Sequence, residues 1–289
     1  MYSRGFPFRS AVSASVAYGA YSLLSLSIYA PSPSTCSSSC SNNNKNNNDN
    51  NHFQKVLTSL YASEKQIRSR WIKDEDNWRK LPARAWPPIQ PPASSEESLR
   101  KKLNECETSS QTADSTPDSN CATISFNLAT CLVFNNLSPS SGLKIYLSTF
   151  EKYGHTDSAL AAGIVLTEGF HLPSSSSSNP DLKKGSEYIL ESSKLSNVQG
   201  KYELGCLYYT GSAEPFIRED MMKAYEMFRE AAEEGHTCSK FMLSDFLFEG
   251  VPDVCEPQKG EALQLLYEAG EKGHRFARQR LLEILDENR

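Results

Sequence analysis

The 289-residue sequence predicts an all-α protein in which residues 121–289 form a short α-solenoid of helix–turn–helix repeats. Three helical segments align along their whole length and end in glycine: DSALAAGIVLTEG, QGKYELGCLYYTG and TCSKFMLSDFLFEG. A variable loop and a second helical pattern follow each of them. The turns that end the second helices recur at spacings of 42, 39 and 38 residues, at Gly154, Ser196, Gly235 and Gly273.

Residues 1–51 are predicted to be a targeting leader and a disordered tract. The first 48 residues contain three basic residues and no Asp or Glu, and serine is abundant, which is typical of mitochondrial transit peptides. The uncharged stretch over residues 11–30 is also compatible with a secretory signal or a weak membrane anchor. We therefore expect a mitochondrial protein, with the ER or secretory pathway as the alternative. The Ser- and Asn-rich tract over residues 32–51 has nothing to bury, which predicts disorder up to His52.

Residues 52–120 are predicted to contain an amphipathic helix, a proline-rich strap, a short helix near residues 99–106 and a polar linker. Apolar residues of the first helix fall at spacings of three, four or seven: Phe53, Leu57, Leu60, Ile67, Trp71 and Trp78. The segment LPARAWPPIQPP contains five prolines and favours an extended chain. Two interpretations compete for Trp71, Trp78 and Trp86. They pack back onto the repeats as part of a strap, which we favour, or they form a docking peptide for a partner.

The composition of the repeats favours close packing of paired helices. Small residues such as Gly163 and Gly205 recur on one helical face and let two helices approach closely. Bulky residues such as Phe228 fill the space between pairs. Glycines such as Gly211 stand just past helix ends, where a left-handed backbone is needed.

This pattern resembles the Sel1-like repeat family, whose motif is roughly A-x-x-x-L-G-x-x-Y-x-x-G, then K-A and an aromatic residue, then A-A-x-x-G. The copy that begins at Gly200 matches best, while Leu243-Ser244 and Ala162-Gly163 replace Leu-Gly in its neighbours. The period exceeds the about 34 residues of a tetratricopeptide unit. The residues that carry the motif are Ala162, Gly163, Gly169, Leu204, Gly205, Tyr208, Gly211, Ala224, Phe228, Ala231, Ala232, Gly235, Leu243, Gly250, Ala262 and Gly273.

No catalytic, cofactor or metal site is expected. The net charge of −5 gives no electrostatic case for nucleic acid. None of the eight cysteines forms a CxxC pair, so free thiols are predicted, with structural disulfides as the alternative if the chain enters an oxidising compartment. Gly-His recurs one repeat apart, at His155, His236 and His274. Such positions are too distant to share a metal ion, so we expect these histidines to serve the turns. Asp245 and Glu249, four residues apart, are expected on a solvated or partner-facing helix surface.

The resemblance implies a protein-binding adaptor or assembly scaffold that offers a helix-lined groove to a protein or peptide. A role in mitochondrial assembly or quality control is the leading expectation. An ER-lumenal or membrane-tethered quality-control adaptor is the alternative, which a glycan on the Asn136 sequon would distinguish. A third interpretation, an enzyme or cofactor binder, requires Cys106, Cys121 or Cys131 to gather with a histidine. No phosphate loop or nucleophile elbow is present, so the chain is not expected to be an enzyme.

Overall fold

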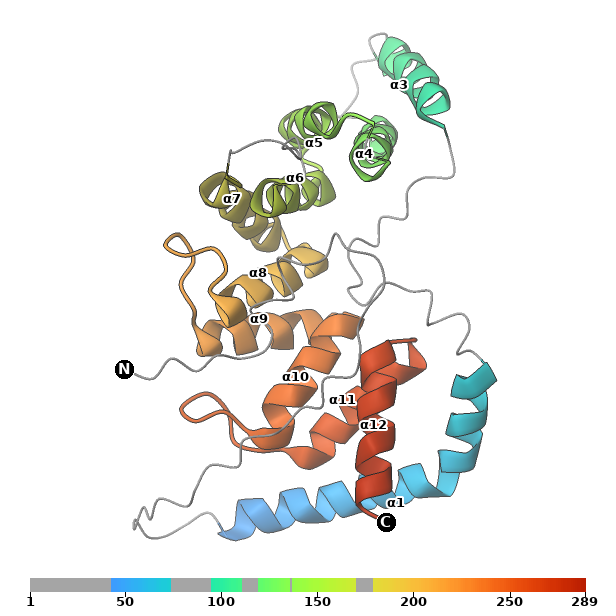
Figure 1. Ribbon diagram of the computed structural model, residues 1–289, viewed down its shortest axis with the longest axis vertical. Helices are drawn as coiled ribbons and strands as arrows, with labels where there is room; N and C mark the ends of the chain where they lie inside the picture. Colours follow the sequence, from blue (N-terminus) through green and yellow to red (C-terminus); the bar gives the residue numbers. More distant parts are fainter. Residues whose placement is uncertain (1–42, 74–94, 111–118, 136, 170–178) are drawn as a thin grey trace.

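The computed structural model describes residues 43–73, 95–110, 119–135, 137–169 and 179–289, and these residues form α-helices that stack into an elongated array (Figure 1). The predicted all-α class is confirmed. The helices are α1 (Asn43–Lys73), α3 (Glu96–Ser110), α4 (Ser119–Phe134), α5 (Pro139–Tyr153), α6 (Thr156–Glu168), α7 (Leu182–Lys194), α8 (Val198–Thr210), α9 (Met221–Glu233), α10 (Thr237–Glu249), α11 (Lys259–Glu271) and α12 (Arg275–Glu287).

The array consists of packed helix pairs. Each first helix packs on the second helix that follows it, α4 on α5, α6 on α7, α8 on α9 and α10 on α11, and α12 ends the array. The backbone is left-handed at all four predicted turns, with φ of 64° at Gly154, 62° at Ser196, and 90° at Gly235 and at Gly273. Ser196 adopts this conformation although it carries a side chain, which normally disfavours it. It is therefore equivalent to the three glycines, and the period predicted from the sequence is the period of the structure.

Histidines begin three of the first helices. The N-caps of α6, α10 and α12 are His155, His236 and His274. In each, Nδ1 accepts a hydrogen bond from the backbone N–H three residues later, at 3.2 Å. Asn197 has the same place before α8, and its side-chain oxygen accepts from the backbone N–H of Gly200 at 2.8 Å. The prediction that these histidines serve the turns is confirmed.

Close approach of paired helices depends on glycine at the crossing points. A Cβ atom at Gly163 would lie 2.9 Å from the carbonyl oxygen of Gly185, across the α6–α7 crossing. A Cβ atom at Gly205 would lie 2.8 Å from Cε1 of Phe228, which is completely buried between α8 and its neighbours. These distances are shorter than ordinary van der Waals contact, so only glycine fits without displacing its neighbours.

Helix α1 lies outside the repeat order and closes the C-terminal end of the array, where it packs across α11 and approaches α12 (Figure 1). The apolar face predicted for it is buried there against α11 and α12, through Phe53, Leu57, Leu60, Ile67 and Trp71. The helix begins at Asn43, so the expectation of disorder up to His52 is wrong for residues 43–51.

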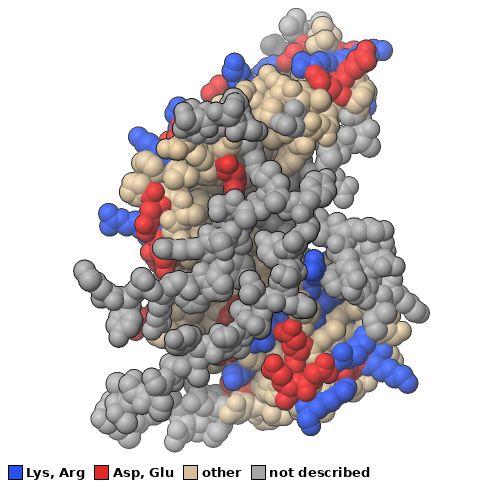
Figure 2. Space-filling model, viewed as in Figure 1, with Lys and Arg blue, Asp and Glu red and all other residues tan. Residues whose placement is uncertain are grey.

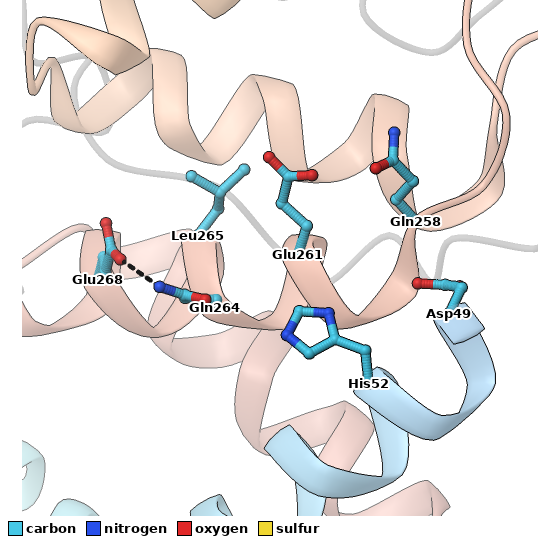
Figure 3. Close-up of a pocket in the computed structure, with 7 residues that line it drawn as sticks. All are labelled: Asp49, His52, Gln258, Glu261, Gln264, Leu265 and Glu268. Atoms are coloured by element: carbon cyan, nitrogen blue, oxygen red, sulfur yellow. Dashed lines mark hydrogen bonds between the residues drawn. The ribbon is translucent and has the colours of Figure 1, made fainter. Parts of the chain in front are cut away.

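Asp49 gives a physical reason for this earlier start. Its carboxylate accepts hydrogen bonds from the backbone N–H groups of Lys259 and Gly260, at 3.1 and 3.4 Å, at the first turn of α11 (Figure 3). Gln258, which precedes α11, makes no side-chain capping bond, whereas α7 and α9 are capped by their own aspartates. Helix α1 therefore supplies α11 with the N-cap that its own sequence lacks.

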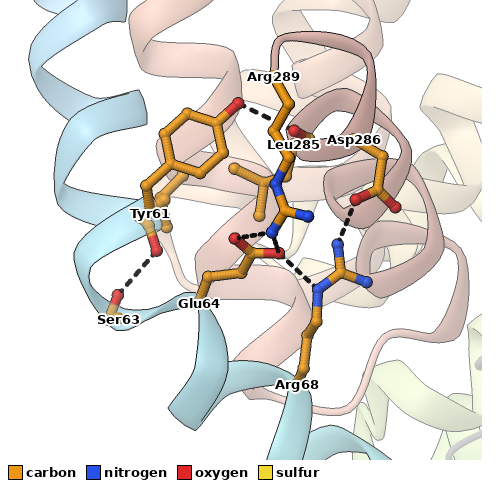
Figure 4. A network of polar contacts seen from close by, with 8 residues as sticks. Tyr61, Ser63, Glu64, Arg68, Leu285, Asp286 and Arg289 are labelled. Atoms are coloured by element: carbon orange, nitrogen blue, oxygen red, sulfur yellow. Dashed lines mark hydrogen bonds and ion pairs between the residues drawn. The ribbon is translucent and has the colours of Figure 1, made fainter.

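The C-terminal half of α1 is fixed by polar contacts as well (Figure 4). The buried carboxylate of Glu64 accepts from Nε of Arg68 at 2.6 Å and from Nη2 of Arg289 at 2.6 and 2.7 Å. Hydrogen bonds from these two guanidinium groups hold the pKa of Glu64 below its usual value. The hydroxyl of Tyr61 donates to the carbonyl oxygen of Leu285 at 2.9 Å. The last residue of the chain is thus tied to its N-terminal helix.

Trp71 packs back onto the array, as the strap interpretation predicts. Its Nε1–H donates to Oε1 of Glu271 at 2.9 Å, and the side chain is only 5% exposed. A Cβ atom at Gly270 would lie 2.9 Å from the Trp71 ring, so the ring occupies space that the glycine leaves free. Trp78 and Trp86, with the rest of the proline-rich segment, lie outside the described residues.

Helix α3 closes the opposite end, against α4. A disulfide joins Cys106 on α3 to Cys121 on α4, with a Cα–Cα distance of 5.8 Å. The prediction of free thiols is therefore wrong for these two cysteines. Spacing could not pair them, because their closeness depends on how α3 packs on α4. The cysteines outside any disulfide among the described residues are Cys131, Cys206, Cys238 and Cys255.

Both end helices present polar outer faces. Figure 2 shows charged side chains gathered at the α3 end and at the α1 end of the visible face. Polar terminal units of this kind keep an α-solenoid soluble, because they cover the apolar faces that the last repeats would otherwise expose. No helix in the described part of the chain is long and apolar enough to cross a membrane, and the stretch over residues 11–30 lies outside that part.

Candidate protein-binding surface

The motif residues of the repeats lie where they position helices. Ten of them are buried: Ala162, Gly163, Leu204, Gly205, Ala224, Phe228, Ala231, Ala232, Leu243 and Ala262. The turn residues have positive φ at helix ends: Gly169, Gly211, Gly235, Gly250 and Gly273. Tyr208 is half-buried, with the ammonium group of Lys223 5.3 Å from its ring centroid. A partner would meet other side chains, which these residues hold in place.

The repeat order identifies which helices could share a ligand-binding surface. Among the described helices, α6 and α8 are neighbouring first helices that contact each other, and no two neighbouring second helices do so to the same extent. The side chains of the first helices α8, α10 and α12 that reach solvent are therefore the candidates for contact with a ligand.

Five of these side chains form a continuous group, which we call the first-helix face: Tyr209, Asp245, Phe248, Glu249 and Arg280. Asp245 and Glu249 are exposed, as predicted for a solvated or partner-facing surface, and the other three are partly exposed. The guanidinium group of Arg280 lies 5.5 Å from the ring centroid of Phe248. The ring centroid of Tyr209 lies 5.8 Å from that of the buried Phe246. Two aromatic rings and three charged groups thus share one surface.

The surroundings of Asp245 shift its protonation equilibrium. Its carboxyl group reaches solvent, yet the surrounding protein atoms raise its pKa to about 6, with Arg280 opposing and Glu249 adding to the shift. Burial raises the pKa of Tyr209, and the neighbouring Asp245 adds to that shift. A carboxylate that is both accessible and poorly solvated gains free energy when a cation approaches it. This face can therefore bind an ammonium or guanidinium group beside apolar rings.

No group of three or more His, Cys, Asp and Glu side chains in the described ranges is placed to hold a metal ion. A cleft of about 310 Å³ between α1 and α11 is lined by Asp49, His52, Gln258, Glu261, Gln264, Leu265 and Glu268 (Figure 3). Within it, Nε2 of Gln264 donates to Oε1 of Glu268 at 3.1 Å. These side chains line the contact of α1 with α11, and nothing in their arrangement indicates a reaction.

The cysteines do not assemble the site that the enzyme interpretation requires. Cys106 and Cys121 are joined to each other, which leaves neither as a thiolate ligand or nucleophile. Cys131 lies in an apolar cluster with Leu99, Leu128 and Leu132, and the described part of its surroundings is that of a core residue.

Sequence reasoning found Asp245 and Glu249 but missed the other members of the first-helix face. A usable signal was present, because Tyr209 and Phe248 are 39 residues apart, which is one repeat. Applying the period to exposed aromatic residues, as well as to the motif, would have selected both. Arg280 has no such signature, since its role depends on how α12 packs beside α10.

A scan against protein-family models finds no match, and a search of curated proteins finds none either. Solved structures do match. One is a protective antigen of uropathogenic Escherichia coli strains with an SLR fold, at a TM-score of 0.50 and 17% identity over 66% of this chain and 37% of that chain. Another is a Sel1 repeat protein from Oxalobacter formigenes, at a TM-score of 0.49 and 16% identity over 65% of this chain and 73% of that chain.

This chain therefore spans well under two thirds of the length of the first of these proteins. At such low identity the likeness concerns the fold alone. The match to the first of these structures confirms the predicted Sel1-like repeat architecture, and the partner has to be argued from the chain's own surface.

Proposed function

We propose that this chain is a protein-binding adaptor or assembly scaffold whose first-helix face takes a protein or peptide segment. The observation that carries the proposal is the closure of both ends of the array, by α1 and by α3. An array closed in this way does not extend by adding further repeats, so its free surfaces are lateral. Of these, the first-helix face combines two carboxylates with aromatic rings and an arginine, and aromatic residues and arginine are enriched at protein interfaces.

The carboxylates of the first-helix face favour a bound segment that carries a basic residue. The carboxylates of Asp245 and Glu249 accept hydrogen bonds from lysine or arginine, while Tyr209 and Phe248 offer apolar contact to its neighbours. Exchange of Asp245 for lysine reverses the charge at the centre of this face. We expect it to weaken partner binding by at least tenfold, because removing one member of a poorly solvated charge pair costs more than about 1.4 kcal/mol.

The test compares two charge reversals in the full chain. Proximity labelling in cells is carried out with the parent, with Asp245→Lys and with Glu226→Lys. Glu226 is an exposed residue of the second helix α9 and serves as the matched control. The proposal predicts that specific neighbours are lost with Asp245→Lys and kept with Glu226→Lys. Equal neighbours for all three proteins would contradict it.

We further propose that the adaptor works in an organelle, in mitochondrial assembly or quality control. The support is the leader-like composition of the first 48 residues, together with the Cys106–Cys121 disulfide, which indicates an oxidising compartment. The same disulfide favours a second candidate, an ER-lumenal or membrane-tethered quality-control adaptor. The two differ in one chemical property, because only the ER pathway would add a glycan to the Asn136 sequon.

Localisation of the full-length chain separates these candidates. The tag is placed after a flexible linker at the C-terminus, since the side chain of Arg289 is hydrogen-bonded to Glu64. A protease-protected mitochondrial pool would support the first candidate. A pool whose mobility shifts with glycosidase would support the second, and diffuse cytosolic protein would contradict both.

A further inference from the structure

Helix α3 is a small cap with little apolar contact. It meets the array through Leu99, which is 4% exposed, and through the partly buried Leu103. These two leucines cover Leu128, Cys131 and Leu132, an apolar patch on α4 that is otherwise the open end of the array. The opposite face of α3 is exposed and polar, through Arg100, Lys101, Lys102, Asn104 and Glu105.

Between the residues that the structure describes, polar contacts add little to this cap. The ammonium group of Lys152 on α5 lies 3.2 Å from Oε1 of Glu107, and both side chains are about half exposed, at 58% and 43%. Exposed ion pairs of this kind contribute little to stability. An isolated helix of 15 residues is itself marginal in water, so α3 needs its attachment to the array in order to persist.

The covalent link is then the main attachment. The Cys106–Cys121 disulfide closes a loop of 15 residues. A cross-link over this length shifts the equilibrium between ordered and disordered states by about a hundredfold. Cys106 lies at the end of the apolar row that includes Leu99 and Leu103, so the bond holds the C-terminal part of the row against the start of α4.

We propose that α3 is a redox-gated cap: a dithiol reductant that cleaves the Cys106–Cys121 disulfide releases α3 and uncovers the apolar end of the array on α4. In the step, the disulfide takes two electrons and two protons and becomes two thiols, while the reductant is oxidised to its own disulfide. With the bond intact, the array is closed at both ends. With the bond reduced, the α3 end is open, and the α1 end, which carries no disulfide among its described residues, stays closed.

The accessibility of the Cys131 thiol reports whether α3 is in place. This thiol is 2% exposed and lies beneath α3, so it becomes accessible when the cap leaves. Cys238, on α10, is 5% exposed and belongs to a different part of the array. It reports whether the array as a whole remains folded.

The experiment measures alkylation of each cysteine in the full chain by N-ethylmaleimide and mass spectrometry, before and after treatment with dithiothreitol. We expect the labelling rate of Cys131 to rise at least tenfold after reduction, while that of Cys238 is unchanged. The variant Cys106→Ser should give the fast Cys131 rate without reductant. Thr108→Ala, an exposed change on the same helix, should keep the slow rate.

Two results would overturn the proposal. An unchanged Cys131 rate after complete reduction would mean that α3 stays docked through its leucines alone. An equal rise in the labelling rates of Cys131 and Cys238 would mean that reduction unfolds the whole array, and that α3 is not released as a separate cap.

Discussion

The histidines that cap α10 and α12 determine how the free energy of unfolding should depend on pH. In each cap Nδ1 must be unprotonated, because it accepts a backbone N–H at 3.2 Å. His236 also has Nε2 2.8 Å from Oε1 of Gln199, an atom that can only accept, which places the ring proton on Nε2. Burial lowers the pKa of His236 to about 4, assisted by the charge of Lys272, and burial likewise lowers the pKa of His274 to about 4.

The sign and size of the effect follow from proton linkage. In the unfolded chain the pKa of a histidine is about 6.5. Between pH 6.5 and 4 the unfolded state therefore binds more protons than the folded state. The stabilisation is therefore complete above about pH 6.5 and is lost as the pH falls toward 4. From pH 7 to pH 5 each of the two caps should lose about 2 kcal/mol, or about 4 kcal/mol together.

Urea unfolding followed by circular dichroism, at pH 7 and at pH 5, measures this loss. The comparison protein is the double variant His236→Asn/His274→Asn, chosen because Asn197 already caps α8 in the same way. Asp245 shifts stability in the opposite direction, since its pKa is raised to about 6, but it is present in both proteins and cancels in the difference. We expect the double variant to be less sensitive to acid by about 4 kcal/mol.

His52→Asn is the matched control, because His52 is exposed and caps no described helix. It leaves both capping histidines in place, so the acid sensitivity that they cause should persist. The reasoning would be refuted if the double variant lost as much stability as the parent between pH 7 and pH 5.

Substitutions at four further positions have predicted effects on the free energy of unfolding, each measurable by urea unfolding at pH 7. Ser196→Gly should raise the free energy of unfolding by about 0.5 kcal/mol, because relief of the left-handed backbone at φ 62° exceeds the added entropy of the unfolded chain. Gly154→Ala is the reverse change at an equivalent turn and should lower the free energy of unfolding by a similar amount. No atom lies within 4 Å of the new Cβ at Gly154, so the backbone conformation alone causes this loss. Gly205→Val should cost about 1–3 kcal/mol, since its Cβ would overlap the ring of Phe228, and a loss below 0.5 kcal/mol would contradict the crossing geometry. Asp49→Ala should cost about 1 kcal/mol through loss of the α11 cap, and Asp49→Asn should keep most of that stability.

The repeats could be predicted from the sequence because their constraints are local and recur. The left-handed turn after each second helix selects glycine, and the one exception, Ser196, was still found from its spacing. Each capping side chain stands directly after that turn, so Gly-His and Ser196-Asn197 mark the starts of first helices. Such features need no knowledge of distant parts of the chain.

The corrections all concern contacts between different helices. Asp49 lies in an Asn-rich tract with no apolar residue, and the backbone N–H groups that donate to its carboxylate are 210 and 211 residues away on α11. Nothing local could show that this tract continues a helix. The Cys106–Cys121 pair presents the same problem, because connectivity among eight cysteines is not determined by spacing. The five members of the first-helix face likewise come from three helices, and only the packing of those helices makes them neighbours.

Helix α1 completes the C-terminal end of the repeat array. In a solenoid each unit is stabilised by the units on either side, so the last pair lacks one neighbour. Here α1 supplies it, burying Leu263 and Leu266 of α11 and Leu281 of α12 completely or almost completely. The start of the repeat domain at residue 121 remains a prediction from the sequence, yet the α11–α12 end of the array is complete only with residues 43–73.

A partner that displaced α1 would have to replace this apolar contact, the Asp49 cap and the Glu64 pairing at once, whereas a partner on the first-helix face displaces none of them. Binding to the lateral face therefore leaves the fold intact, which is the property that an adaptor requires.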